Sequence, residues 1–537
     1  MTGFTSVVAG GTTITARGAV RDAAERVLGR LWIDRVPARL AAEDADLWPA
    51  SAGRDDGPLC RPARPGPSRA LLERLAGLRA ETAAAGLTEV AFAGPRTAAA
   101  AVGLAVRGFS DGTGAPPASL EGGDPGPVAR LAADPARLAR TAVVLGGNDP
   151  VLGEVRDRLT DRLTAAGLAP GEAAARFVVV APPGSDAAED AAERGHRFVP
   201  APAPTAFGAL SPYALVPAAL AGADVAALLD EAAAVLPALA RPENNPGLVL
   251  GAILGGAARA GRETVVLDGF RAAPPALADW IGVLLQESTG GRLRPLVQYG
   301  GVPVLPGDDV FLLTLDGRPH QDDATVSGPL AAQLVVWEHA AAVAAYLLGG
   351  DPLAPARAGP EAAGAERAAP LFTEGAGATM VEIRTADPGL TGASDLSDLF
   401  ALLAGRASAD GPLSVAAFLD ADPVRGEGAQ VRRLAAVLAA RAARPVTVAW
   451  GCRCPAIGND LREKGVYLVL SGDVWSGGAR RTGGGGDRGG PVGARRFARA
   501  AGAARAAHAA GRPVAWLHLR DRRAGLARLL DSARSGE

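Results

Sequence analysis

Short apolar runs alternate with longer segments of helical periodicity through the first half of the chain. The apolar runs have the length of buried strands, and the segments between them repeat their apolar residues at helical spacing. This alternation predicts a doubly wound parallel sheet with helices on both faces. The predicted strands are 89–93, 141–145 and 176–181, and the predicted helices are 70–85, one from residue 97, 151–166 and 186–194.

A second cycle of the same kind begins near residue 245, and a third group of strands follows a linker rich in Ala, Pro and Gly at 351–370. We therefore expect an α/β protein with two doubly wound parallel-sheet domains and a C-terminal α/β lobe. The expected domains are an N-terminal helical segment and linker at 1–69, a first domain at 70–235, a second at 236–360, and the lobe at 361–537 with a Gly/Arg-rich loop at 475–495.

Composition narrows the class of protein. The chain has 537 residues, 48% of them hydrophobic, and a formal net charge of -2, so no excess of basic residues indicates nucleic-acid binding. The apolar stretch 213–240 is interrupted by Asp224, Asp230 and Glu231, which predicts buried helices and no membrane span. Three cysteines and no recognisable signal peptide fit a reducing cytoplasm, and we expect no metal or cofactor.

The candidate chemistry lies in the segment WIGVLLQESTGGRL, residues 280–293. Trp280 and Leu284 belong to the apolar face of a predicted helix, which ends near Glu287. A carboxylate at a helix end, followed by the hydroxyls of Ser288 and Thr289 and by two glycines, is typical of a general base that faces a pocket.

This segment, together with NPGLVLG at 245–251 and TVVL at 264–267, resembles the second half of bacterial phosphoglucose isomerases. The resemblance is to the actinobacterial form related to transaldolase/phosphoglucose isomerase fusions. It implies two sugar isomerase (SIS) domains and a homodimer. It also implies that Glu287 is the base that moves a proton between C1 and C2 of the sugar.

Elsewhere the chain departs from the pattern of that family. The Ser/Thr-rich phosphate loop after the strand 141–145 is replaced by Gly146-Gly147-Asn148-Asp149, in which a carboxylate replaces the hydroxyls. Asp149-Pro150 is also typical of a helix start. In the loop after the strand 89–93, Gly94 and Thr97 remain as candidate substrate-binding residues with Ser288 and Thr289, and Arg96 is interpreted as a surface arginine.

The chain also differs from that family at further catalytic positions. The arginine that the family uses to stabilise the enediolate corresponds to Ala206, and both C-terminal histidines of the family are missing. Lys464, the only lysine in the chain, matches the active-site lysine of the family. Of the five histidines, His339 is interpreted as a packed or surface residue.

Three functions remain open. The first is a degenerate paralogue, or pseudoenzyme, with a binding, scaffolding or regulatory role in sugar-phosphate metabolism and a protein partner among sugar-phosphate enzymes. The second is an aldose–ketose isomerase in which Glu287 and Lys464 act on an altered sugar. The third is unchanged isomerisation of glucose 6-phosphate and fructose 6-phosphate. The ligand is in each case a sugar or a sugar phosphate.

Overall fold

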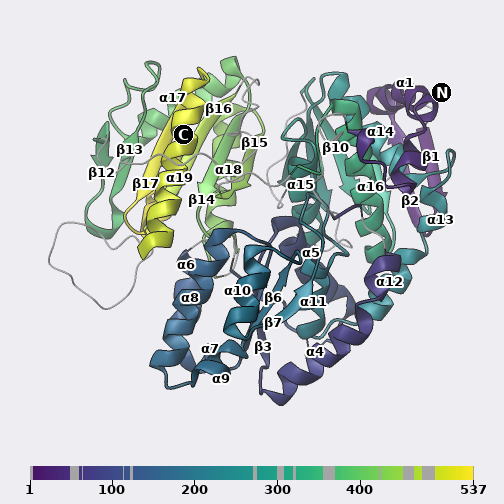
Figure 1. Cartoon of the computed structure of the whole chain (residues 1–537). Helices are drawn as coiled ribbons and strands as arrows, with labels where there is room; N and C mark the ends of the chain where they lie inside the picture. Colours follow the sequence, from purple (N-terminus) through teal and green to yellow (C-terminus); the bar gives the residue numbers. More distant parts are fainter. Residues whose placement is uncertain are drawn as a thin grey trace. The chain divides into compact units, whose positions relative to one another are not determined.

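The structure is a computed structural model of the whole chain (Figure 1). It describes residues 4–48, 60–62, 65–112, 114–120, 125–269, 275–298, 307–317, 322–354, 369–422, 425–451, 465–473 and 490–535. The chain forms two compact units. Unit one comprises Met1–Gly122, Asp134–Tyr299 and Pro306–Ala356, and unit two comprises Gly123–Ala133, Gly300–Leu305 and Arg357–Glu537.

Unit one contains a parallel five-stranded sheet with the order β4-β3-β5-β6-β7. Its strands are β3 (Glu89–Ala93), β4 (Ala118–Ser119), β5 (Thr141–Gly146), β6 (Phe177–Ala181) and β7 (Arg197–Pro200). Every residue of β5 and β6 is buried. Continuous apolar strands are expected where helices cover both faces of a parallel sheet.

The two faces of this sheet carry different helices. Val178 and Val180 pack in the main core with α11, whereas Val179 and Ala181 pack with Ala191 of α10. Figure 1 shows α8 and α10 on one side of the sheet and α5 and α11 on the other. The helices of this domain are α3 (Pro65–Arg69), α4 (Leu72–Ala84), α5 (Arg96–Phe109), α7 (Pro135–Ala139), α8 (Pro150–Ala165), α9 (Pro170–Ala174), α10 (Asp186–Arg194), α11 (Pro212–Leu220), α12 (Val225–Ala233) and α13 (Leu236–Leu239).

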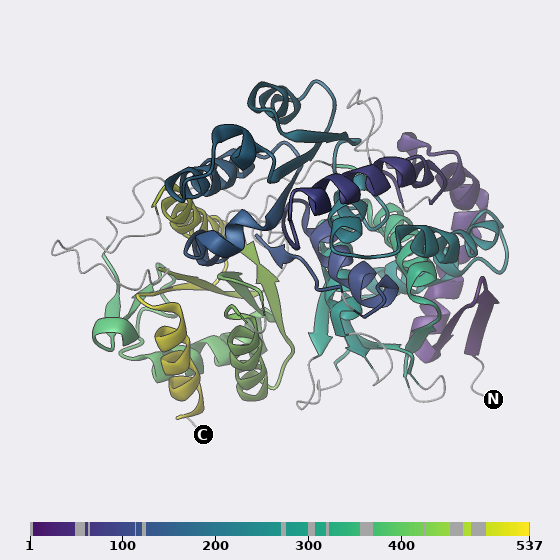
Figure 2. The ribbon, with the colours of Figure 1, turned by 90° about the horizontal axis from the view of Figure 1, so that it is seen from below.

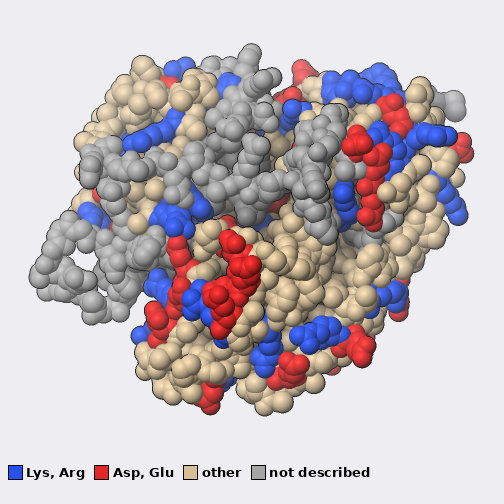
Figure 3. Space-filling model, viewed as in Figure 1, with Lys and Arg blue, Asp and Glu red and all other residues tan. Residues whose placement is uncertain are grey.

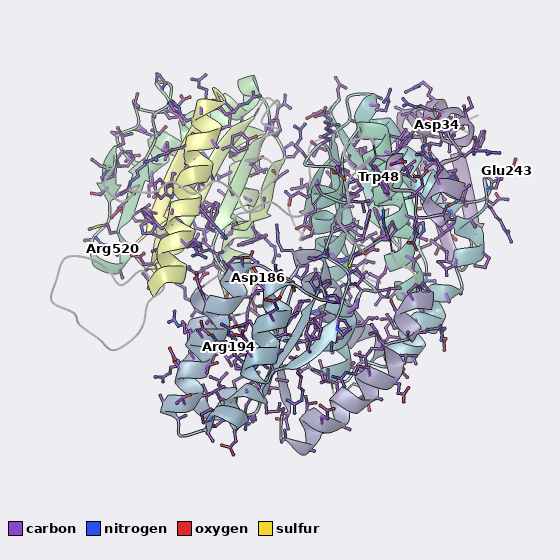
Figure 4. The ribbon with its side chains drawn as sticks, in the orientation of Figure 1. Asp34, Trp48, Asp186, Arg194, Glu243 and Arg520 are labelled. Atoms are coloured by element: carbon purple, nitrogen blue, oxygen red, sulfur yellow. The ribbon has the colours of Figure 1, made fainter. Side chains whose placement is uncertain are left out.

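The charges of α10 follow the helix dipole. Asp186 lies in its first turn and Arg194 in its last, and Figure 4 shows both side chains on this helix. Negative charge near a helix N-terminus and positive charge near the C-terminus are each favourable. Arg194 also bonds to Asp190 one turn before it, with Nε 2.8 Å from Oδ1.

The second sheet of unit one has the order β1-β2-β11-β10-β8-β9. Its parallel part consists of β8 (Thr264–Gly269), β9 (Arg294–Gln298), β10 (Val310–Leu315) and β11 (Ala324–Ser327). An antiparallel hairpin of β1 (Phe4–Ala9) and β2 (Thr12–Arg17) extends this sheet through β11. Figure 2 shows the hairpin at the edge of the sheet, beside the N-terminus.

The helices of this second domain pack closely. They are α1 (Gly18–Ile33), α2 (Val36–Ala41), α14 (Pro246–Arg259), α15 (Pro275–Ser288) and α16 (Leu330–Leu348). A Cβ at Gly251 of α14 would lie 2.4 Å from the Cβ of Val343 on α16, and a Cβ at Gly256 would lie 2.6 Å from the carbonyl oxygen of Ala23 on α1. Glycines therefore let α14 approach both neighbours.

Helix α16 is the centre of this core. Among the described residues it is the helix with the length and composition of a membrane span, and 83% of its apolar window is buried inside the protein. Trp48 packs against it with its indole Nε1 3.3 Å from the carbonyl oxygen of Ala342 (Figure 4). The helix is thus enclosed by other parts of the fold.

Unit two contains a six-stranded sheet with the order β12-β13-β17-β16-β14-β15. Its strands are β12 (Phe372–Glu374), β13 (Val381–Arg384), β14 (Leu413–Phe418), β15 (Val446–Trp450), β16 (Val466–Gly472) and β17 (Val514–Leu519). Helices α17 (Leu396–Asp410), α18 (Gly428–Ala442) and α20 (Arg522–Arg534) cover one face, and α19 (Gly490–Ala509) covers the other. The short α6 (Pro125–Ala132) also belongs to this unit.

The predicted fold class is confirmed, since two domains and a lobe of α/β type are each built on a largely parallel sheet. Strand β3 and helix α10 have the predicted bounds. The hairpin β1–β2 and the strand β7 were not predicted.

On the face seen in Figure 3, acidic and basic side chains are interspersed.

Candidate functional site

Glu287 lies in the last turn of α15, as predicted. The helix is anchored by Trp280, Leu284 and Leu285, which are fully buried. Glu287 itself is partly exposed, but its Oε1 is buried and has no hydrogen-bond partner among the described residues. A buried carboxylate oxygen without a hydrogen bond is costly, which makes Glu287 the unusual group of this segment.

The two hydroxyls after Glu287 bond within their own segment. Thr289 Oγ1 donates to the carbonyl oxygen of Leu285 at 2.6 Å and accepts from the N–H of Leu293 at 3.2 Å. Ser288 is fully buried, with Oγ 3.5 Å from the same carbonyl oxygen. These hydroxyls stabilise the end of α15.

The segment that follows α16 contacts both the end of α15 and the loop that precedes α11. A Cβ at Gly350 would lie 3.2 Å from the carbonyl oxygen of Ser288. Two residues further on, the carbonyl oxygen of Pro352 accepts from the N–H of Ala206 at 3.3 Å. The segment of Glu287 and Ala206, where the resemblance implies an arginine, thus pack against the same short segment. Ala206 is buried and presents only a methyl group.

Gly94 and Thr97 lie at the carboxyl end of β3 and the start of α5. A Cβ at Gly94 would fall 2.5 Å from the ring of Phe92 and 3.2 Å from the carbonyl oxygen of Gly146, so only glycine lets these two loops approach. Thr97 is fully buried, and its Oγ1 has no partner among the described residues. A Cβ at Gly208 would lie 3.3 Å from this hydroxyl.

The loop after β5 bonds to the protein itself. Gly147 has a φ of 107° and donates its N–H to the carbonyl oxygen of Val180 at 2.8 Å. Asn148 Oδ1 accepts from the N–H of Ala187 at 2.9 Å. Asp149 caps α8, since its Oδ1 accepts from the N–H of Val151 at 3.0 Å. The interpretation of Asp149-Pro150 as a helix start is confirmed.

Glu338 of α16 is a buried charge whose role was not predicted. It has no exposed surface, and its Oε1 accepts from the N–H groups of Gly208 and Ala209 at 2.9 and 2.8 Å. Burial, together with the negative charge of Glu338, raises the pKa of the nearby Cys60 thiol to about 12. A carboxylate within an otherwise apolar helix was the available signal, because buried charges require partners.

Lys464 lies outside the described residues, so the structure does not place the candidate lysine. His339 bonds through Nδ1 to the carbonyl oxygen of Val335 at 2.9 Å, on its own helix.

Solved structures align with this chain at low sequence identity. No protein-family model matches the sequence, and no curated protein matches it. A hypothetical protein from Thermus thermophilus aligns over 63% of this chain and 94% of its own, at 16% identity and a TM-score of 0.47. A glucose-6-phosphate isomerase from Chlamydia trachomatis aligns over 65% of this chain and 86% of its own, at 14% identity and a TM-score of 0.51. The chain therefore has an α/β fold of the SIS type, shared with a glucose-6-phosphate isomerase.

Proposed function

We propose that this protein is a non-catalytic relative of the sugar-phosphate isomerases, with a binding or regulatory role in sugar-phosphate metabolism. The observation that carries the proposal is the cap of α8 by Asp149. In the family that the sequence resembles, the loop after this strand holds the phosphate of the substrate. Here the same loop bonds to its own helices through Asn148 and Asp149.

The charge of Asp149 opposes a phosphate at that place. Two like charges about 4 Å apart repel by roughly 4 kcal/mol at an effective dielectric constant of about 20. Such a repulsion weakens binding on the order of a thousandfold. The N–H of Val151 donates to the carboxylate of Asp149, the N–H of Leu152 donates to the carbonyl oxygen of Asp149, and Pro150 has no N–H. These first positions of α8 are therefore not offered to a ligand in the way a phosphate-binding helix offers them.

Loss of the arginine supports the same conclusion. Proton transfer between C1 and C2 of a sugar places negative charge on an enediolate oxygen, and a nearby donor or cation must stabilise it. At Ala206 the chain presents a buried methyl group. Glu287 alone supplies a base without this stabilisation.

The remaining properties follow from the proposed role. We expect a homodimer in the cytoplasm, a protein partner among sugar-phosphate enzymes, and a sugar or sugar phosphate as ligand. No nucleic acid or membrane is expected as a partner.

A coupled assay for conversion of fructose 6-phosphate to glucose 6-phosphate tests the proposal. The purified protein is compared with Glu287→Gln, and thermal shifts are recorded with sugar phosphates and free sugars. We expect no turnover by either protein. Turnover by the natural protein that Glu287→Gln abolishes would overturn the proposal.

The second candidate is an active aldose–ketose isomerase that uses Glu287 on an altered sugar without a phosphate, or on glucose 6-phosphate and fructose 6-phosphate. The specific observation in its favour is the buried Oε1 of Glu287, which has no hydrogen-bond partner within the described part of the chain. Such an oxygen is available to accept a proton from a substrate. Turnover of a free aldose that depends on Glu287 would establish this alternative.

A further inference from the structure

The connections of the sheet in unit two run in opposite directions from β14 and β16. From β14 the chain passes through α18 to β15 on one side, and from β16 it passes through α19 to β17 on the other. Helices α18 and α19 pack on opposite faces of this sheet. In open α/β sheets, ligands bind outside the carboxyl ends of the two strands at such a switch point. We call the carboxyl ends of β14 and β16 the switch-point edge.

Asp420 follows β14 at the switch-point edge, and its own loop holds it in place. Only 6% of its surface is exposed. Its N–H donates to Glu427 Oε2 at 3.0 Å, and its Oδ1 accepts from the N–H of Asp422 at 3.0 Å. A Cβ at Gly426 would lie 2.4 Å from the Cγ of Asp420, so the loop closes tightly around this carboxylate. The second carboxylate oxygen, Oδ2, bonds outside this loop.

The partner of Oδ2 comes from a distant part of the sequence. Arg130 of α6 donates from Nη2 to Oδ2 of Asp420 at 2.5 Å. In the sequence, α6 lies between β4 and β5 of the first sheet, and Arg130 precedes Asp420 by 290 residues, yet both belong to unit two. A buried carboxylate is stable when a cation or several donors compensate its charge. The guanidinium group of Arg130 therefore brings positive charge from α6 to the switch-point edge.

Arg522 supplies a second guanidinium group to the same edge. It is buried, and its Nε donates to the carbonyl oxygen of Gly472, at the end of β16, at 3.0 Å. Its Nη1 lies 3.5 Å from Glu427 Oε2. Arg522 begins α20, the helix that follows β17 of this sheet, whereas Arg130 comes from a helix outside the run of strands that forms the sheet. The chemistry of this edge is thus the pairing of carboxylates with guanidinium groups.

We propose that the carboxylate of Asp420 is a guanidinium-binding site at the switch point of unit two. Arg130 is its internal ligand, and α6 is a strap that closes the site. A fixed carboxylate matches a guanidinium group in charge and in hydrogen-bond geometry. A ligand that carries a guanidinium group is excluded while Arg130 occupies Asp420, and it binds when the strap leaves. This inference goes beyond the proposed function, since it involves neither Glu287 nor Asp149.

Hydrogen–deuterium exchange of the full-length protein tests the strap, with exchange read at the amides of α6. Arg130→Ala removes the guanidinium group, and Arg130→Lys keeps the positive charge without the planar group. Asp420→Asn removes the charge of the site and nearly keeps its shape. The double variant Arg130→Ala/Asp420→Asn tests whether the two residues act together.

Arg69→Ala is the matched control, with exchange read at α12, which carries its partner Asp230. The side chains of Arg69 and Arg130 are each 42% exposed, but that of Asp230 is 67% exposed and that of Asp420 is 7% exposed. The two arginines therefore differ in the burial of the carboxylate that they bind.

We expect Arg130→Ala to speed exchange in α6 about tenfold or more, because the buried carboxylate loses this cation. Arg130→Lys is expected to fall between Arg130→Ala and the natural protein. Asp420→Asn is expected to speed exchange as well, and the double variant should exchange no faster than Arg130→Ala, since the second change removes nothing further. Arg69→Ala is expected to change exchange in α12 by less than about twofold, as for an exposed ion pair.

Methylguanidinium is the probe for the vacated site in Arg130→Ala. At concentrations far below denaturing ones, it should bind this variant and raise its unfolding temperature relative to sodium chloride at the same ionic strength. It should not do so for the natural protein, in which Arg130 occupies the site, or for the double variant, in which the charge of Asp420 is gone.

Exchange in α6 at the natural rate in both Arg130→Ala and Arg130→Lys would overturn the strap. So would a double variant whose effect equals the product of the two single effects, which would mean that Arg130 and Asp420 act independently. Failure of methylguanidinium to stabilise Arg130→Ala, or equal stabilisation of Arg130→Ala and the double variant, would overturn the guanidinium site.

Discussion

The carboxylate of Asp149 lies 3.0 Å from the backbone nitrogen of Val151 and accepts its hydrogen bond. The first turn of α8 is thus closed by a charge of the chain itself. Replacing an N-cap aspartate by alanine costs about 0.5–2 kcal/mol, whereas asparagine caps nearly as well.

We therefore predict that Asp149→Ala lowers the free energy of unfolding by about 1 kcal/mol and that Asp149→Asn changes it little. Denaturation in urea measures both values. Equal stabilities for the alanine and natural proteins would mean that the cap contributes nothing, and the structural explanation for the altered loop would be lost.

Close packing of α14 against α16 gives a second prediction. Alanine at Gly251 would place its Cβ 2.4 Å from the Cβ of Val343, so Gly251→Ala must displace a helix. We expect a loss of about 1–3 kcal/mol. Gly77 of α4 is the matched control, since a Cβ there meets nothing within 4 Å. Gly77→Ala is expected to stabilise by about 0.5–1 kcal/mol. Thermal unfolding measures both variants. If their unfolding temperatures shifted in the same direction, the close packing of α14 against α16 would be contradicted.

The buried carboxylate of Glu338 gives a third prediction. Glu338→Ala leaves the amides of Gly208 and Ala209 without their acceptor, and each unmade buried bond costs about 1–3 kcal/mol. Glu338→Gln keeps an acceptor oxygen and is expected to lose less. Glu243→Gln, at an exposed position labelled in Figure 4, serves as control and is expected to be neutral. If chemical denaturation gave Glu338→Ala the same free energy of unfolding as this control, Glu338 would not stabilise the loop that contains Gly208 and Ala209.

A fourth prediction concerns pH. Burial lowers the pKa of His196 from its ordinary value of 6.5. As the pH falls through about 6.5, the unfolded chain binds a proton at this residue before the folded chain does, so the free energy of unfolding decreases. Between about pH 7.5 and about pH 5.5 the natural protein should lose more stability than His196→Asn.

The exposed His508 supplies the matching control, His508→Asn, which should follow the natural protein. The contact of the His196 ring with Phe177, at 5.1 Å between centroids, is lost in the asparagine variant at every pH, so the slope against pH is the informative quantity. Parallel stability curves for the natural protein and His196→Asn would refute the prediction.

Much of the fold was accessible from the sequence because buried strands and amphipathic helices carry distinct periodicities. The strand Glu89–Ala93 is an example. The hairpin β1–β2 was missed, although Gly10-Gly11 separates two runs rich in β-branched residues. Both glycines have positive φ, 58° and 77°, as the tight turns of two-residue hairpins require. The signal for a hairpin is therefore present in the sequence.

The site was less predictable, because its features depend on contacts between distant residues. Sequence placed Glu287 at a helix end, but did not show that its Oε1 is buried without a partner among the described residues. Arg96 was interpreted as a surface arginine, whereas its Nη1 is buried. The bonds from Gly208 to Glu338 join residues 130 positions apart in the chain, which no local pattern reveals.

We propose that the protein lacks isomerase chemistry, and exchange of substrate protons with solvent measures this most directly. The protein is incubated in D₂O with fructose 6-phosphate, glucose 6-phosphate and their unphosphorylated sugars, and deuterium at C1 and C2 is followed by NMR. Exchange reports proton abstraction even where turnover is slow. We predict no incorporation above a protein-free control. Incorporation that disappears in Glu287→Gln would contradict the account and establish Glu287 as a working base.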